Sequence, residues 1–184
     1  MYCPALVVPD GGGYNARPIQ GDAVCMKRRM LLAFGAGLPF AARAQAPDPT
    51  GPQPELPKEK LVIVTRDGAQ HVFNVEMALK PDQQITGEMF RTAIPEDGGM
   101  LFDWGFPRAV PMWMRNTLVP LDMVFINADG TIRSIAEDTV PRSLAPIDSR
   151  GPVRATLELG AGVTAKLDIR VGDTVRQRIF NNIG

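Results

Sequence analysis

The sequence feature that most constrains the fold is a four-residue turn, Asn127-Ala128-Asp129-Gly130, between two apolar runs. The runs are residues 122–126 and 131–135. An Asp-Gly pair accepts the positive φ angles that tight β-hairpin turns demand. The segment therefore predicts an antiparallel hairpin, which commits this part of the chain to a β-sheet.

A second hairpin is predicted nearer the start of the folded region. Residues 60–65 and 70–77 are rich in β-branched side chains and flank an Asp67-Gly68 turn. In the second run apolar and polar residues alternate, which is typical of a strand with one buried face and one solvent face. Glu76 belongs to the polar set, so we expect it on the solvent face.

Two short helices complete the predicted elements. Pro81 suits the first turn of a helix and Asp82 favours its positive end. A second helix is expected at 163–167, and further strands at 100–102, at 154–159 and from Thr174 to near Phe180. The pattern predicts an α+β fold that is mostly antiparallel β, a small barrel-like sheet with two short helices.

The N-terminal part has the layout of a secretory signal peptide at residues 26–44. Lys27-Arg28-Arg29 precede an apolar stretch, residues 30–40, and Ala42-Arg43-Ala44 follows. The stretch is about half of the roughly 20 residues that a membrane-spanning helix needs. The paired arginines also resemble a twin-arginine signal. We therefore expect a periplasmic or secreted protein with no membrane span in the mature chain.

Residues 1–25 precede this signal and are interpreted as a mis-called N-terminal extension. Both cysteines, Cys3 and Cys25, belong to that extension, so the mature chain is expected to have neither a disulfide nor a lipid anchor. Residues 45–58 are proline-rich and predict an extended linker. Residues 59–184 are then a single globular domain, expected to be a monomer.

Charge disfavours one class of partner. The chain before Ala44 holds five basic and two acidic residues, which leaves 15 basic and 18 acidic residues and a net charge of −3. A mildly acidic domain is a poor nucleic-acid binder, because phosphate contacts need clustered cations. We expect no nucleic-acid partner.

The run WMRNTLVPLDMVFINADGTIRSI, residues 113–135, places polar side chains between two predicted strands. Together with GGMLFDW at 98–104, LELGAG at 157–162 and VGD at 171–173, it resembles the prokaryotic family called domain of unknown function 192. The resemblance implies a compact β-rich domain, often exported, without an established activity. Glu88 departs from the family pattern, which usually has an apolar residue there.

The segment from Trp113 to Asp122 is the leading candidate for a binding site. The amide, hydroxyl and carboxylate groups of Asn116, Thr117 and Asp122 stand beside a tryptophan and could orient a small polar ligand. The same residue types also hold irregular turns by bonding nearby backbone amides. The segment is thus either a binding surface or a well-bonded structural loop.

Glu158 is the second candidate. It stands between Leu157 and Leu159, so its side chain faces away from them and is expected to be solvated or bonded to Arg91 or Arg154. Paired carboxyl groups can act as acid and base when their environments separate their pKa values. An acid/base hydrolase using Asp122 and Glu158 is therefore an alternative function, and it requires the two side chains to converge.

Clustered methionines suggest a third function, because thioethers are soft ligands suited to Cu(I). Methionine also commonly fills irregular cores. The chain has one histidine, and the mature part has no cysteine, so zinc chemistry is excluded and we expect no metal site or cofactor. The five clustered methionines are Met89, Met100, Met112, Met114 and Met123.

The sequence favours an exported, non-catalytic domain that binds a small polar ligand or an envelope protein. A single histidine and the absence of a Gly-x-Ser-x-Gly motif exclude a recognisable serine hydrolase. The candidate ligand-binding residues are Arg91, Trp113, Asn116, Thr117, Asp122 and Glu158.

Overall fold

The predicted Asp129-Gly130 hairpin is present in the structure, a computed structural model that describes residues 48–183. Strand β4 (Leu121–Ile126) pairs antiparallel with strand β5 (Ile132–Ala136). Gly130 between them has a φ of 89°, as the turn requires. The predicted extension and signal peptide, and with them Cys3 and Cys25, lie outside the described residues.

The other strands join this hairpin in one seven-stranded sheet of order β5-β4-β6-β3-β2-β1-β7. Strands β2 and β3 pair in parallel, and the other neighbours pair antiparallel. The remaining elements are β1 (Lys58–Val64), β2 (Gln70–Ala78), α1 (Pro81–Thr86), β3 (Met100–Met112), β6 (Ile147–Gly160), α2 (Val163–Lys166), β7 (Thr174–Arg176) and a 3-10 turn (Arg178–Phe180).

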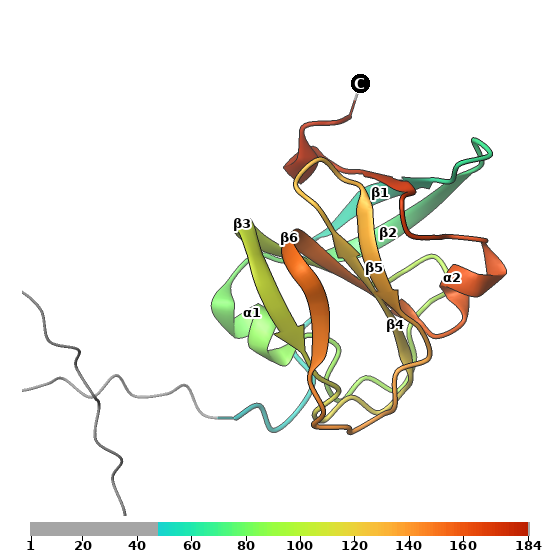
Figure 1. The fold of residues 1–184 in the computed structure, drawn as a ribbon. Helices are drawn as coiled ribbons and strands as arrows, with labels where there is room; N and C mark the ends of the chain where they lie inside the picture. Colours follow the sequence, from blue (N-terminus) through green and yellow to red (C-terminus); the bar gives the residue numbers. More distant parts are fainter. Residues whose placement is uncertain (1–47, 184) are drawn as a thin grey trace, which may run out of the picture. The chain divides into compact units, whose positions relative to one another are not determined.

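Hydrogen bonds between the two edges of the sheet nearly close it into a barrel. The Val175 N–H donates to the carbonyl of Gly130 at 2.8 Å, and the Ile132 N–H donates to the carbonyl of Asp173 at 2.8 Å. Figure 1 shows α1 beside β3 and α2 on the opposite side of the domain. The predicted fold, a mostly antiparallel barrel-like sheet with two short helices, is confirmed. Within residues 48–183 no helix is both long and apolar enough to cross a membrane.

The sheet buries apolar side chains on both of its faces. One cluster contains residues from all seven strands and fills the barrel interior, with Leu101, Val124 and Leu157 at its centre. A second cluster, which includes Phe102 and Met123, lies on the other face of β3, β4 and β6. Because successive strand residues alternate between faces, Glu158 points toward the second cluster.

The structure differs from two expectations about polar segments. Residues 53–57 of the predicted linker contact the domain: Gln53 Nε2 donates to the carbonyl of Gly87 at 2.9 Å, and Leu56 is buried. The Leu56 N–H also donates to Glu76 Oε2 at 2.8 Å. Glu76 was expected on a solvent face and is instead only 3% exposed, because Leu56 and Arg91 cover it.

Candidate functional site

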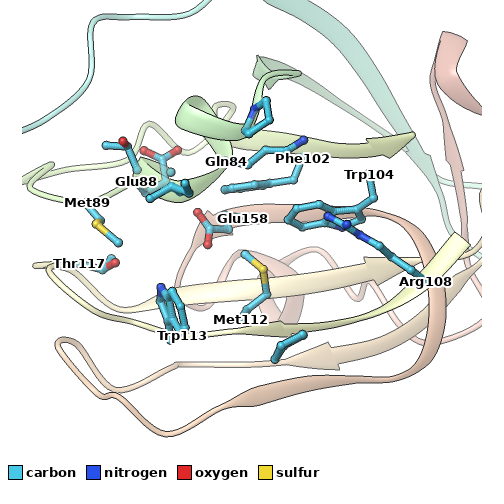
Figure 2. Close-up of a pocket in the computed structure, with 15 residues that line it drawn as sticks. Gln84, Glu88, Met89, Phe102, Trp104, Arg108, Met112, Trp113, Thr117 and Glu158 are labelled. Atoms are coloured by element: carbon cyan, nitrogen blue, oxygen red, sulfur yellow. The ribbon is translucent and has the colours of Figure 1, made fainter. Parts of the chain in front are cut away.

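A cavity of about 270 Å³ opens between α1, β3, β6 and the loop that follows β3, and we call it the groove. Figure 2 shows Glu158 in the middle of its lining, with Glu88 and Met89 toward one end and Trp104 and Arg108 toward the other. Most of the remaining wall is apolar. The polar and aromatic side chains that line the groove include Gln84, Glu88, Trp104, Arg108, Trp113, Thr117 and Glu158.

The turn after α1 is held tightly against the sheet. Gln84 Nε2 donates to the carbonyls of Ala78 at 3.1 Å and Asp103 at 2.7 Å, which fixes the helix over β3. Gly87 ends the helix with a φ of 50°, and a Cβ there would lie 3.0 Å from the ring of Phe102. A glycine is needed at this position, because a side chain would meet both backbone strain and the ring. The close approach brings Glu88 into the groove.

Glu158 lies on β6 opposite Met100 of β3 and Met123 of β4. It is only 5% exposed, and its Oε2 atom has no hydrogen-bond partner among the described residues. Burial, followed by the charge of Glu88, raises the pKa of Glu158 to about 8. The expectation of a solvated side chain or a bond to Arg91 or Arg154 is wrong, because Glu158 is buried, Arg91 pairs with Glu76 and Glu88, and Arg154 pairs with Asp103.

Glu88 is the second buried carboxyl group of the groove, at 2% exposure. Its Oε2 lies 3.0 Å from Arg91 Nε, close enough for an ion pair, but the orientation makes no hydrogen bond. Burial raises the pKa of Glu88 to about 7, against the lowering effect of Arg91 and with a further rise from Glu76. The groove therefore holds two carboxyl groups that titrate near neutral pH.

Arg91 stands behind the groove and is already engaged. Its Nη1 and Nη2 atoms donate to the two carboxylate oxygens of Glu76 at 2.5 and 2.8 Å. Burial acts to raise the pKa of Glu76, but the hydrogen bonds from Arg91 and the Leu56 N–H hold it below its usual value. Arg91 lines a neighbouring hollow rather than the groove, so its effect on the groove is through Glu88.

Aromatic rings form the other end of the groove. Phe102 and Trp104 stack with their centroids 5.7 Å apart, and Trp104 Nε1 donates to Thr156 Oγ1 at 3.1 Å. The guanidinium of Arg108 lies 5.0 Å from the centre of the Trp104 ring. Trp113 is 48% exposed and stands beside Arg115, whose guanidinium is 5.2 Å from its ring. These rings give a ligand flat apolar surfaces next to the two carboxyl groups.

The structure brings three of the six predicted site residues together in the groove, namely Trp113, Thr117 and Glu158. Asn116 does not line the groove, but its backbone supports the adjacent loop. Its φ is 58°, and its carbonyl accepts a hydrogen bond from the Phe90 N–H at 2.9 Å. This bond ties the turn that carries Glu88 to the loop that carries Trp113. Asn116 is thus a connecting residue of the site.

Asp122 is on the opposite face of the sheet from Glu158. In the pairing of β4 with β6, Asp122 is opposite Leu159 and Met123 is opposite Glu158, so the two carboxyl groups do not converge. Asp122 is fully buried and accepts three hydrogen bonds, from the N–H of Asp138 and from the N–H and hydroxyl of Thr164. Its role is to hold the loop after β5 and the start of α2.

Replacing Asp122 with alanine is expected to lower the free energy of unfolding by about 3 kcal/mol, because buried donors lose their acceptor. Asp122→Asn retains one acceptor oxygen and is expected to cost less. Urea denaturation measures both changes. A wild-type stability for Asp122→Ala would contradict this structural role.

The five clustered methionines divide between core and groove. Met100, Met112, Met114 and Met123 belong to the second apolar cluster, and Met114 Sδ lies 3.1 Å from Thr139 Oγ1. Met89 and Met112 line the groove. No group of three His, Cys, Asp or Glu side chains within residues 48–183 is placed to hold a metal ion.

Sequence reasoning missed the residues that shape the two ends of the groove. Glu88 stood out only as a departure from a family pattern, and Trp104 and Arg108 were not singled out at all. The strand that carries Trp104 and Arg108 was predicted only at 100–102, whereas β3 extends to Met112. The sequence did carry one signal for Glu88: it is a charged residue at a position after α1 where the surrounding pattern calls for an apolar one.

The fold and site define a small domain with a barrel-like sheet and a groove beside α1 that holds two buried carboxyl groups. The chain belongs to the DUF192 family, described as Uncharacterized ACR, COG1430, whose model matches residues 62–177. The resemblance noted in the sequence is thereby confirmed. No curated protein matches the chain.

Four chains of solved structures match this chain, and two of them are the following. A protein from Sinorhizobium meliloti 1021, provisionally described as a transcription regulator, is 46% identical, with a TM-score of 0.67, and the match covers 69% of this chain and 98% of that one. A protein of unknown function from Novosphingobium aromaticivorans DSM 12444 is 36% identical, with a TM-score of 0.65, and the match covers 77% of this chain and 99% of that one.

Proposed function

We propose that this domain binds a small polar ligand in the groove. The observation that carries the proposal is Glu158, whose carboxyl group is nine-tenths buried, faces the groove and leaves Oε2 without a hydrogen bond. An unsatisfied buried acceptor costs free energy, which a ligand donor would recover. A mostly apolar wall with a few convergent polar groups is typical of small-molecule sites.

The signal peptide predicted at residues 26–44 supports a location in the periplasm or outside the cell, so the ligand would come from that compartment. The ligand could also be a polar side chain of an envelope protein. Trp113, Phe106 and Ile85 are exposed and offer such a protein an apolar contact surface. The residues of this chain after Ala44 have a net charge of −3, which disfavours binding to nucleic-acid phosphates and so a role in transcription regulation.

Binding is expected to depend on Glu158. In a thermal-shift screen of small polar compounds at about pH 8.5, where Glu158 is mostly ionised, followed by calorimetric titration, Glu158→Gln should weaken any hit by about tenfold or more, because a charge-assisted hydrogen bond is lost. Glu96→Gln is the matched control, since Glu96 is exposed and pairs only with Lys166. Hits whose affinity is the same in Glu158→Gln and the wild type would place the ligand elsewhere.

Acid/base catalysis is a second candidate, favoured by the two carboxyl groups of the groove. Glu88 takes the place of Asp122 in this alternative, because Glu88 and Glu158 have pKa values near 7 and 8 and line the same cavity. Two carboxyl groups with displaced pKa values can serve as acid and base. Turnover of chromogenic ester or glycoside substrates that is lost in Glu158→Gln would distinguish catalysis from binding.

The Cu(I) alternative now depends on Met89 and Met112, the two thioethers that line the groove. Soft thioether ligands suit Cu(I), but four of the five clustered methionines also pack in the apolar core. Titration with Cu(I) alone, on the wild type and on Met89→Leu, tests this reading. Equal Cu(I) affinity of the wild type and Met89→Leu would exclude a Cu(I) site in the groove.

A further inference from the structure

The groove has an unbalanced negative end. Glu76, Glu88 and Glu158 are all nine-tenths buried or more; Arg91 pairs with Glu76 and Glu88, and the charge of Lys58 also acts on Glu76. Glu76 takes both terminal nitrogens of Arg91, which leaves only Nε beside Glu88. Glu158 makes no ion pair within the described residues. Glu158 therefore has no paired cation within the described residues when it ionises.

The opposite end of the groove carries a positive charge. Arg108 comes from β3, and its guanidinium lies over Trp104 at 5.0 Å and Phe106 at 5.8 Å. It makes no ion pair among residues 48–183. Stacking on two rings restrains the guanidinium while leaving its N–H donors available to an anionic group. Figure 2 shows Arg108 and Glu88 on opposite sides of Glu158.

We propose that the ligand of the groove is a small zwitterion, with a primary ammonium group held by Glu88 and Glu158 and a carboxylate held by Arg108. This inference rests on the proposed binding function and names its ligand class. An ammonium group has three donors and a positive charge, so it can donate to Glu158 Oε2, which has no partner among the described residues, and add a second cation beside Glu88, whose Oε2 already lies near Arg91. A carboxylate matches the planar fork of a guanidinium.

The walls between the two charged ends suit a short aliphatic spacer. Phe102, Met112 and Trp113 supply apolar surface to the groove, whose volume is about 270 Å³. A neutral polyol would satisfy the hydrogen bonds but would leave the charge at both ends uncompensated. A simple amine would compensate only the acidic end. The zwitterion is the one class that matches both ends and the apolar middle.

Isothermal titration with a series of ω-amino acids tests the proposal directly. The probes are glycine, β-alanine, 4-aminobutyrate, 5-aminovalerate and 6-aminohexanoate, with butylamine and pentanoate as single-charge controls. One chain length should bind best, and about fivefold or more tighter than either control, the effect of one partly exposed ion pair. Equal binding of butylamine and the best zwitterion would overturn the role of Arg108.

Variants separate the two ends of the groove. Arg108→Gln is expected to remove the advantage of the zwitterion over butylamine while leaving butylamine binding unchanged, whereas Glu158→Gln should weaken both by about tenfold. Arg170→Gln is the matched control, because Arg170 is exposed and pairs only with its neighbour Asp168. An advantage that persists in Arg108→Gln would contradict the assignment of the carboxylate to this residue.

Affinity for the zwitterion should also rise with pH. The charged groups around the ammonium position are Glu158 and Glu88, with Arg91 behind Glu88, and beyond them Glu76 and Lys58. Raising the pH from about 6.5 to about 8.5 ionises Glu88 and Glu158 while the amine stays protonated, since its pKa is near 10.

If a neutral polyol binds in a Glu158-dependent way and zwitterions do not, the ligand class is wrong and the proposed function stands. If no compound binds in a Glu158-dependent way, the proposed function itself fails.

Discussion

Replacing Arg91 with methionine is expected to lower the free energy of unfolding by about 4 kcal/mol, the usual cost of removing one partner from a buried ion pair. Glu76 would lose both of its guanidinium donors while it remains 3% exposed, and Glu88 would lose its only cation. Urea denaturation at neutral pH measures the change. Leu56 also bonds to Glu76, so the contact of residues 53–57 with the domain should weaken as well.

A compensating variant separates charge from packing in this prediction. Arg91→Met with Glu76→Gln removes the uncompensated carboxylate, so the double variant should recover part of the loss, because an unpaired buried charge is the costly element. Arg170→Gln is the control and should change stability by less than about 0.5 kcal/mol, since Arg170 and Asp168 are both exposed. If Arg91→Met lowers the free energy of unfolding no more than Arg170→Gln does, the buried ion pair does not stabilise the fold.

The strands and the turns between them could be predicted because their signals are local. Asp129-Gly130 fixes a hairpin without reference to the rest of the chain, and the alternation within β2 and β6 identifies which residues share a face. The alternation of β2 nevertheless placed Glu76 in solvent. Its burial depends on Arg91 and on the segment before β1, and neither contact is visible in the local pattern.

The site could be predicted only in part, because the register between strands decides which polar groups meet. Asp122 and Glu158 lie on neighbouring strands, yet a register that pairs Asp122 with Leu159 sends the two side chains to opposite faces. Trp113 and Thr117 were predicted correctly as members of one loop. Glu88 enters the groove through the close contact of Gly87 with Phe102, a tertiary approach that no spacing in the sequence encodes.

The domain is expected to become less stable as the pH rises from about 5 to about 8.5, the reverse of the usual behaviour of paired carboxylates. In the unfolded chain Glu88 and Glu158 lose their protons near 4.5, whereas in the folded domain their pKa values are about 7 and about 8. Between these values the folded state binds more protons than the unfolded state, so the free energy of unfolding falls with pH. Glu76 has a lowered pKa, so its contribution is complete above about 4.5 and stays constant in this window.

The size of this effect follows from the shift of Glu158, since each pKa unit corresponds to about 1.4 kcal/mol. A loss on the order of 4 kcal/mol lowers the Tm of a domain of this size by roughly 10 °C, which scanning calorimetry across the pH range resolves. Glu158→Gln cannot titrate and should remove about half of the slope, leaving the part due to Glu88, while Glu96→Gln, at an exposed ion pair, should retain all of it. A saturating zwitterion should flatten the wild-type slope, because it stabilises the ionised carboxyl groups. A wild-type Tm that rises with pH, or a slope unchanged in Glu158→Gln, would mean that these carboxyl groups are already compensated in the folded domain.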